Sequence, residues 1–160
     1  MNLYIEPTPD SATGLFSRDT KGEIAMLNLL RLRDIADYSE HPELAPSKTI
    51  SGREAFQKYI DHTLPFQTES GGKILFLGRG GPYFVGPQKS RWDLVMLIQQ
   101  RSLQSFFNFA SNVNYMAGIG HRTSAIVDSR LLPIDPFWII AYYTIVVQIL
   151  NEQHRMMSGA

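Results

Sequence analysis

The sequence predicts one α+β domain whose elements follow the order strand, helix, strand, strand, helix, strand. Its 160 residues are enough for one domain with a proper core and too few for two comfortable ones. A content of 44% hydrophobic and 19% charged residues is typical of a globular protein and excludes a disordered one. Short apolar runs alternate with segments of helical periodicity and with turn-rich connections, and this alternation sets the element order.

The first half of the chain predicts a strand, a long loop and a helix. The nearly continuous apolar run 24–33 indicates a strand covered on both faces, although periodicity alone also permits a short helix. Residues 34–49 contain two prolines and predict a loop. Ser51 and Glu54 have capping-box spacing, and Pro65 is expected to kink or end the helix that begins there. The buried stripe of this helix would consist of Ala55, Phe56, Tyr59, Ile60 and Thr63.

The second half predicts two strands, a helix and a last strand. Residues 73–78 and 92–98 are apolar and predict two strands. The connection 79–90 is rich in turns, with at most a brief extended piece at 83–85. Because it contains no helix, the two strands should pair antiparallel. Ser102 is a candidate helix cap. The last strand would span 124–132 and stop at Pro133. The buried face of the second helix would consist of Leu103, Phe106, Phe107, Ala110 and Val113.

This order of elements is that of a ferredoxin-like antiparallel sheet with both helices on one face. The other face is also apolar, so a second copy of the chain is its simplest cover, and we expect a homodimer or a higher homo-oligomer. The predicted division is an N-terminal arm at 1–22, the α+β domain at 23–133 and a C-terminal apolar extension at 134–160.

Charge and cysteine content exclude several function classes. The 15 basic and 15 acidic residues cancel, so no net field would attract nucleic acid. The absence of cysteine excludes disulfides, thiolate catalysis and Cys-ligated metals, and the scattered histidines give no metal motif. We therefore expect no metal and no cofactor. The first 21 residues lack a signal-peptide pattern, and no apolar run is long enough to span a bilayer, so a cytoplasmic location is expected.

A set of spaced residues carries a family resemblance. It consists of 52–59, Gly71-Gly72, Trp92 with its apolar run, Tyr115, His121-Arg122 and Asp128-Ser129-Arg130. This pattern resembles the domain of unknown function family 1330, which belongs to the dimeric α+β barrel superfamily. The resemblance covers about two thirds of the chain. It implies a ferredoxin-like monomer whose sheet packs against the sheet of a partner, in a superfamily of several unrelated chemistries that selects no single reaction.

Four side chains are candidates for a functional site. His121 could move a proton and Arg122 could hold a carboxylate or enolate oxygen, which would make them catalytic; alternatively, they are a helix-end histidine and an arginine paired with Asp128. Asn28 is the polar residue in the middle of the first strand, where its amide would bind either a ligand or neighbouring protein groups. Tyr59 could direct its hydroxyl to a ligand at the boundary between helix and sheet.

The extension contains the apolar run 137–150, preceded by Asp135-Pro136. Proline at the first helical position indicates a helix, although its Val and Ile content also permits an extended arm. The run is too short to span a bilayer, and burial at a subunit interface is preferred over attachment to a membrane surface.

Two functions from different classes remain open at this point. The first is a cofactor-independent enzyme or binding protein for a small apolar or aromatic molecule, with a pocket between helices and sheet. The second is a non-catalytic structural or regulatory oligomerisation module. A cavity with convergent polar groups would favour the first, and a filled core with a large interface would favour the second.

Overall fold

The computed structural model describes residues 3–136 and 147–149. Their elements alternate as the sequence predicts from the first strand onward, with additional helices. The elements are α1 (Pro9–Phe16), β1 (Ile24–Leu32), the short 3-10 helix η1 (Pro42–Leu44), α2 (Gly52–Glu69), β2 (Lys73–Arg79), β3 (Leu94–Gln100), α3 (Leu103–Ala110), α4 (Val113–Met116), α5 (Ile119–Ala125) and β4 (Ile126–Ile134).

The strands form one sheet in the order β2-β3-β1-β4, and every neighbouring pair is antiparallel. In the centre of the sheet, Leu27 of β1 pairs with Leu97 of β3 on one side and with Leu132 of β4 on the other. This topology is ferredoxin-like. The predicted α+β fold and the antiparallel pairing of the second and third strands are confirmed.

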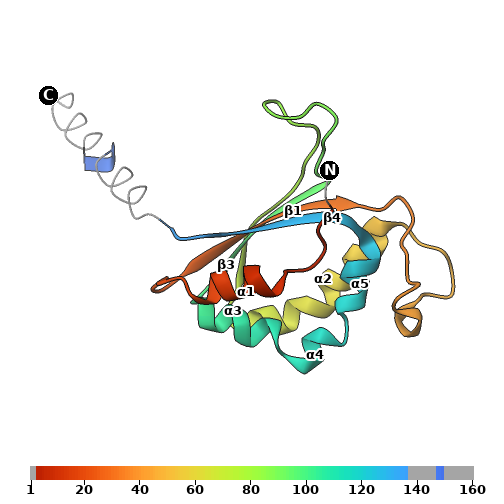
Figure 1. The fold of residues 1–160 in the computed structure, drawn as a ribbon, viewed down its shortest axis with the longest axis horizontal. Coiled ribbons are helices and arrows are strands. Elements are labelled where there is room, and N and C mark those ends of the chain that lie inside the picture. Colours follow the sequence, from red (N-terminus) through yellow and green to blue (C-terminus); the bar gives the residue numbers. More distant parts are fainter. Residues whose placement is uncertain (1–2, 137–146, 150–160) are drawn as a thin grey trace, which may run out of the picture.

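The two faces of the sheet have different surroundings. Figure 1 shows α1, α2, α3, α4 and α5 on one side of the sheet. Because side chains alternate along a strand, Met26 and Leu30 of β1 point to the helices and are buried, whereas Leu27 and Leu29 point to the other face and are only half-buried. No helix of the described residues covers that second face, which we call the open face.

Helix α2 begins as predicted, and of the two alternatives expected at Pro65, a kink or an end, the structure excludes the end. The Ser51 side chain accepts a hydrogen bond from the Glu54 amide and the Glu54 carboxylate accepts one from the Ser51 amide, which makes a capping box. The helix continues through Pro65 to Glu69, and Gly71 follows it at a φ of 79°, a conformation that favours glycine. A proline removes one helical hydrogen bond, and α2 continues past this loss into a turn in which Gln67 is buried.

The predicted second helix is three helices. Ser102 caps α3 as predicted, but the Asn112 side chain accepts hydrogen bonds from two amides and starts α4. Val113 is therefore 82% exposed, and its predicted place on the buried face is wrong. Ser124 belongs to α5, and β4 runs on through Pro133. Proline is tolerated there because β4 is an edge strand of the sheet.

The N-terminal arm contains a helix, and little of the C-terminal extension belongs to the described residues. Within the predicted arm 1–22, Thr8 caps the helix α1, and Phe16 packs on Phe107 of α3 with ring centroids 5.4 Å apart. The arm thus contains an ordered helix docked on the domain. Most of the predicted extension 134–160 lies outside the described residues. In the described part of the chain, no helix has both the length and the apolar character needed to cross a membrane.

Candidate functional site

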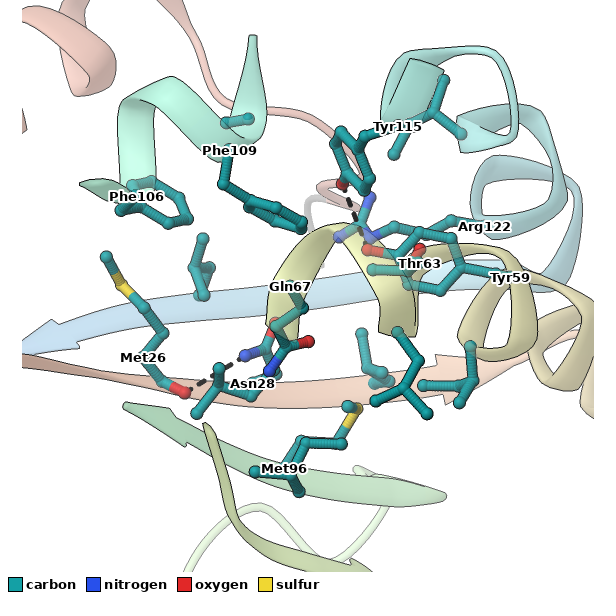
Figure 2. A pocket seen from close by; sticks show the side chains of 18 of the residues that line it. Met26, Asn28, Tyr59, Thr63, Gln67, Met96, Phe106, Phe109, Tyr115 and Arg122 are labelled. Atoms are coloured by element: carbon teal, nitrogen blue, oxygen red, sulfur yellow. Dashed lines mark hydrogen bonds between the residues drawn. The ribbon is translucent and has the colours of Figure 1, made fainter. Parts of the chain in front are cut away.

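A cavity of about 430 Å³ lies between the helices and the sheet. Residues of all four strands and of α2, α3, α4 and α5 form its walls, together with Glu6 and Pro7 of the N-terminal segment. Most of the lining is apolar, with aromatic rings from the helices facing methionines from the strands (Figure 2). The apolar lining includes Met26, Leu30, Phe56, Met96, Phe106 and Phe109.

Asn28 lies on the cavity wall in the middle of β1, where the sequence places it. Its side-chain amide donates a hydrogen bond of 3.2 Å to the carbonyl of Met26 on its own strand (Figure 2). This contact satisfies one donor of the amide with a backbone group of its own strand. Its role in ligand binding stays a prediction.

Three further polar groups lie along the wall formed by α2 and the end of β3. Thr63 and Gln67 are one helical turn apart on α2, and Gln100 ends β3; each is at most 5% exposed and lines the cavity. Thr63 Oγ1, Gln67 Nε2 and Gln100 Oε1 are buried and have no hydrogen-bond partner among the described residues. Buried polar atoms are nearly always paired in native proteins, so these three need a partner that residues 3–136 and 147–149 do not supply.

Tyr59 and Tyr115 form a hydroxyl pair in the cavity wall. Their oxygens are 3.1 Å apart and their rings meet edge to face at a centroid distance of 6.4 Å (Figure 2). Burial raises the pKa of the Tyr115 phenol, the adjacent Tyr59 raises it further, and the charge of Arg122 opposes the rise. The Tyr115 hydroxyl therefore stays neutral at physiological pH and can donate a hydrogen bond.

Arg122 lines the cavity and also fastens its N-terminal wall. One guanidinium nitrogen donates to the carbonyl of Ile5 at 2.9 Å, and another donates to Ser129 Oγ at 3.2 Å. The predicted alternative, an ion pair of Arg122 with Asp128, is not formed; Arg130 pairs with Asp128 instead. Arg122 thus connects α5, β4 and the segment that closes the cavity.

His121 is not among the residues that line this cavity. Its Nδ1 is 2.8 Å from the hydroxyl of Tyr38 in the loop after β1, and the two rings meet edge-on at 5.7 Å. Burial lowers the pKa of His121, and the charges of Lys58 and His62 lower it further. The structure therefore brings together three of the four predicted site residues, Asn28, Tyr59 and Arg122, and places His121 behind them against the loop.

Comparison with solved structures gives a family. The crystal structure of RPA0582, a protein of unknown function from Rhodopseudomonas palustris, is similar to this chain with a TM-score of 0.76 and 30% sequence identity, over 85% of this chain and 98% of that one. The methylated RPA0582 protein gives a TM-score of 0.76 and 31% identity, over 86% and 97%. This chain belongs to the RPA0582 family.

The other comparisons with known proteins give no information on function. A dimeric protein of unknown function and ferredoxin-like fold from Bacteroides fragilis gives a TM-score of 0.45 at 10% identity, over 73% of this chain and 99% of that one. No protein-family model matches the sequence, and no curated protein matches it. Because RPA0582 is itself of unknown function, the chemistry has to be argued from the cavity.

The cavity of this RPA0582-family chain is suited to hold a small molecule by its apolar body and to hydrogen-bond it at two places. One is the wall of Thr63, Gln67 and Gln100, and the other is the cluster of Tyr59, Tyr115 and Arg122. Within residues 3–136 and 147–149, no group of three or more histidine or carboxylate side chains is arranged to hold a metal ion.

Proposed function

We propose that the protein binds a small, mainly apolar molecule that carries both hydrogen-bond donors and acceptors in the cavity between helices and sheet. The observation that carries this proposal is the set of three buried, unpartnered polar atoms in a largely apolar lining, on Thr63, Gln67 and Gln100. A volume of about 430 Å³ is within the range of small-molecule sites.

The three polar atoms make demands that a single ligand could meet. Gln67 Nε2 requires an acceptor, Gln100 Oε1 requires a donor, and Thr63 Oγ1 accepts either. A buried polar group without a partner costs about 1–3 kcal/mol of stability, so an arrangement of three is expensive for a purely structural core. A ligand amide or a hydroxyl beside a carbonyl would recover this cost on binding.

A catalytic role is a further part of the proposal and needs no cofactor. The neutral Tyr115 hydroxyl and the Arg122 guanidinium lie in the same part of the wall and would stabilise negative charge that develops on a bound oxygen. His121, which the sequence suggested as the proton carrier, would act only from outside the lining, through the position of its neighbour Arg122. Binding without turnover remains the core of the proposal.

The test uses two probes with the same apolar body, 2-naphthamide and naphthalene. The wild-type chain is expected to bind the amide more tightly, and Gln100→Leu should reduce that preference about fivefold, the worth of one hydrogen bond. Thr63→Val should weaken amide binding similarly while raising the free energy of unfolding, because it removes a buried hydroxyl without a partner. Fluorescence titration measures the binding, and urea unfolding measures the stability.

A matched control lies next to Gln100 in the sequence. Gln99 is on the open face, where its side chain donates to Glu23 at 2.6 Å, so Gln99→Leu should leave binding of both probes unchanged. The proposal is wrong if the wild-type chain binds neither probe, or if Gln100→Leu and Gln99→Leu behave alike.

A second candidate function, assembly into a homodimer, is favoured by the open face of the sheet. Phe76 and Leu132 on this face are 55% and 53% exposed, and Leu97 and Val95 between them are half-buried. Soluble proteins rarely leave such a contiguous apolar surface uncovered, and we propose that a second copy of the chain covers it. This assembly is compatible with ligand binding, since the cavity lies on the opposite side of the sheet.

Membership of the domain of unknown function family 1330 and a cytoplasmic location are also kept as proposals. The family resemblance is supported by the position of its residues, because Tyr115 and Arg122 both line the cavity. The location rests on the sequence alone.

A further inference from the structure

A second cavity, of about 300 Å³, lies beside the first and has a different character. It is formed where the loop after β1 crosses the C-terminal end of α5, and the N-terminal segment separates it from the larger cavity, since Glu6 lines both. Apart from Ile5, every residue that lines it is polar or charged. A site of this composition is unsuited to the apolar ligand proposed above.

Backbone hydrogen bonds fix the walls of this second cavity. The amide of Arg33 donates to the carbonyl of Ala125 at 2.9 Å, and the amide of Asp37 donates to the carbonyl of Ser124 at 2.9 Å. The amide of Ala36 donates to the carbonyl of Ile50 at 3.0 Å. The loop is therefore fastened to α5 on both sides of the cavity, and the cavity is formed before any ligand arrives.

Two lining residues carry buried polar atoms without a partner. Ser124 is 1% exposed, and its Oγ has no hydrogen-bond partner among the described residues. The Nε atom of Arg33 is also buried and has no hydrogen-bond partner among those residues. A guanidinium and a hydroxyl can both donate to one carboxylate, and arginine does so in a planar, two-bond geometry. These two residues therefore specify an acceptor with the shape of a carboxylate.

Carboxylates occupy other parts of the same wall. Glu6, Asp37 and Glu40 line the cavity together with the single arginine Arg33 and with His41. Hydrogen bonds from Ser39 lower the pKa of Asp37, and the charge of Arg33 adds to the effect, so Asp37 is ionised at neutral pH. In the described part of the chain no carboxylate lies within ion-pair distance of Arg33.

These charges decide between three kinds of ligand. A simple anion would meet Arg33 but would be repelled by an excess of carboxylates, and a simple cation would leave Arg33 and Ser124 without a partner. A zwitterion satisfies both parts of the wall. We propose that this cavity binds a small amino acid, with its carboxylate on Arg33 and Ser124 and its ammonium group facing Glu6, Asp37 and Glu40.

The experiment uses the full chain and three probes with the same four-carbon chain, 4-aminobutanoate, butanoate and butylamine, together with the standard amino acids. At least one zwitterion should raise the thermal midpoint of unfolding and bind in a calorimetric titration. If 4-aminobutanoate is the zwitterion that binds, butanoate and butylamine should bind at least about tenfold more weakly or not at all. Arg33→Met should weaken the zwitterion about tenfold or more, and Ser124→Ala about fivefold.

Controls separate this site from a loss of fold and from the larger cavity. Arg79 is an exposed arginine on β2, and Arg79→Met should leave zwitterion binding unchanged. Binding of 2-naphthamide should survive in Arg33→Met, which shows that the variant is folded and that the two sites are independent. The proposal is overturned if no zwitterion binds, if butanoate binds as well as the zwitterion, or if Arg33→Met retains full affinity in a folded chain.

Discussion

The buried polar side chains of this protein are concentrated at its two cavities. Among the described residues, six side chains have a buried polar atom without a hydrogen-bond partner. Those of Thr63, Gln67 and Gln100 line the larger cavity, and those of Arg33 and Ser124 line the smaller one; only the sixth, Thr20, lines neither. Random packing defects would be spread through the core, so this concentration indicates positions kept for bound molecules.

His121 gives a prediction about pH at the residue scale. Its pKa in the folded chain is lower than the ordinary value of 6.5, chiefly through burial. Between the two values the unfolded chain binds more protons, so stability falls as the pH drops through the window just below 6.5 and is regained above it. His121→Gln should flatten this part of the curve of unfolding free energy against pH, measured by urea denaturation at closely spaced pH values.

The hydrogen bond between Tyr38 and His121 supplies the control for this prediction. Tyr38→Phe keeps the edge-on ring contact with His121 and removes the hydroxyl at 2.8 Å. Because burial is the main cause of the shift, the pKa of His121 should remain below 6.5 in this variant, as followed by proton NMR. A histidine that titrates at or above 6.5 in the folded wild-type chain would contradict the assignment.

At the scale of elements, the sequence predicted what depends on local pattern. The capping box of Ser51 and Glu54 and the apolar runs of the strands are local signals, and the corresponding elements were found. The ends of elements were harder, because they depend on packing. Pro65 does not stop α2, and Gln67 in the following turn is buried. The break at Asn112, which separates α3 from α4, was concealed by a single apolar stripe.

The difference between local sequence patterns and long-range packing also explains which site residues could be predicted. Asn28 was conspicuous as a polar residue inside an apolar strand, and Tyr59 as a tyrosine on a buried stripe. Gln67 continues that stripe one turn after Thr63, but it follows the proline that was expected to kink or end the helix. Gln100 reaches the cavity only through the register of β3, which places it on the helix-covered face beside Ile24. Spacing in the sequence cannot show such long-range proximity.

Pro65 gives the prediction that belongs to this scale. It lies inside α2, where it lacks the amide that would donate to the carbonyl four residues earlier. Pro65→Ala should restore this hydrogen bond and raise the free energy of unfolding by about 1–2 kcal/mol, less than the full helix-propensity difference because alanine also loosens the unfolded chain. Chemical denaturation monitored by circular dichroism measures the change.

Lys58 is an exposed position of the same helix and serves as the control. Lys58→Ala should change stability by less than about 0.5 kcal/mol, because nothing is buried there. A destabilised Pro65→Ala variant would contradict this prediction and would show that the proline itself is needed where α2 packs.

At the scale of the whole molecule, the two sides of the sheet differ in what covers them. The side covered by helices α1 to α5 (Figure 1) contains the buried core and both cavities, whereas on the open side Phe76 and Leu132 are exposed. The long connection between β2 and β3 adds Phe84 and Val85, which are 99% and 83% exposed. Side chains of this kind at full exposure are costly in water unless another surface meets them.

This exposed surface leads to the prediction of a dimer through the open face. The 18.1 kDa chain should sediment at twice its mass at micromolar concentration. Leu97 lies at the centre of the open face, paired with Leu27 and Phe76, so Leu97→Lys would bury a charge in the interface and should weaken the dimer at least about tenfold. Val113→Lys alters an exposed apolar residue on the helix side and should leave the dimer intact. A wild-type monomer, or equal sedimentation of the two variants, would show that the open face is not the subunit interface.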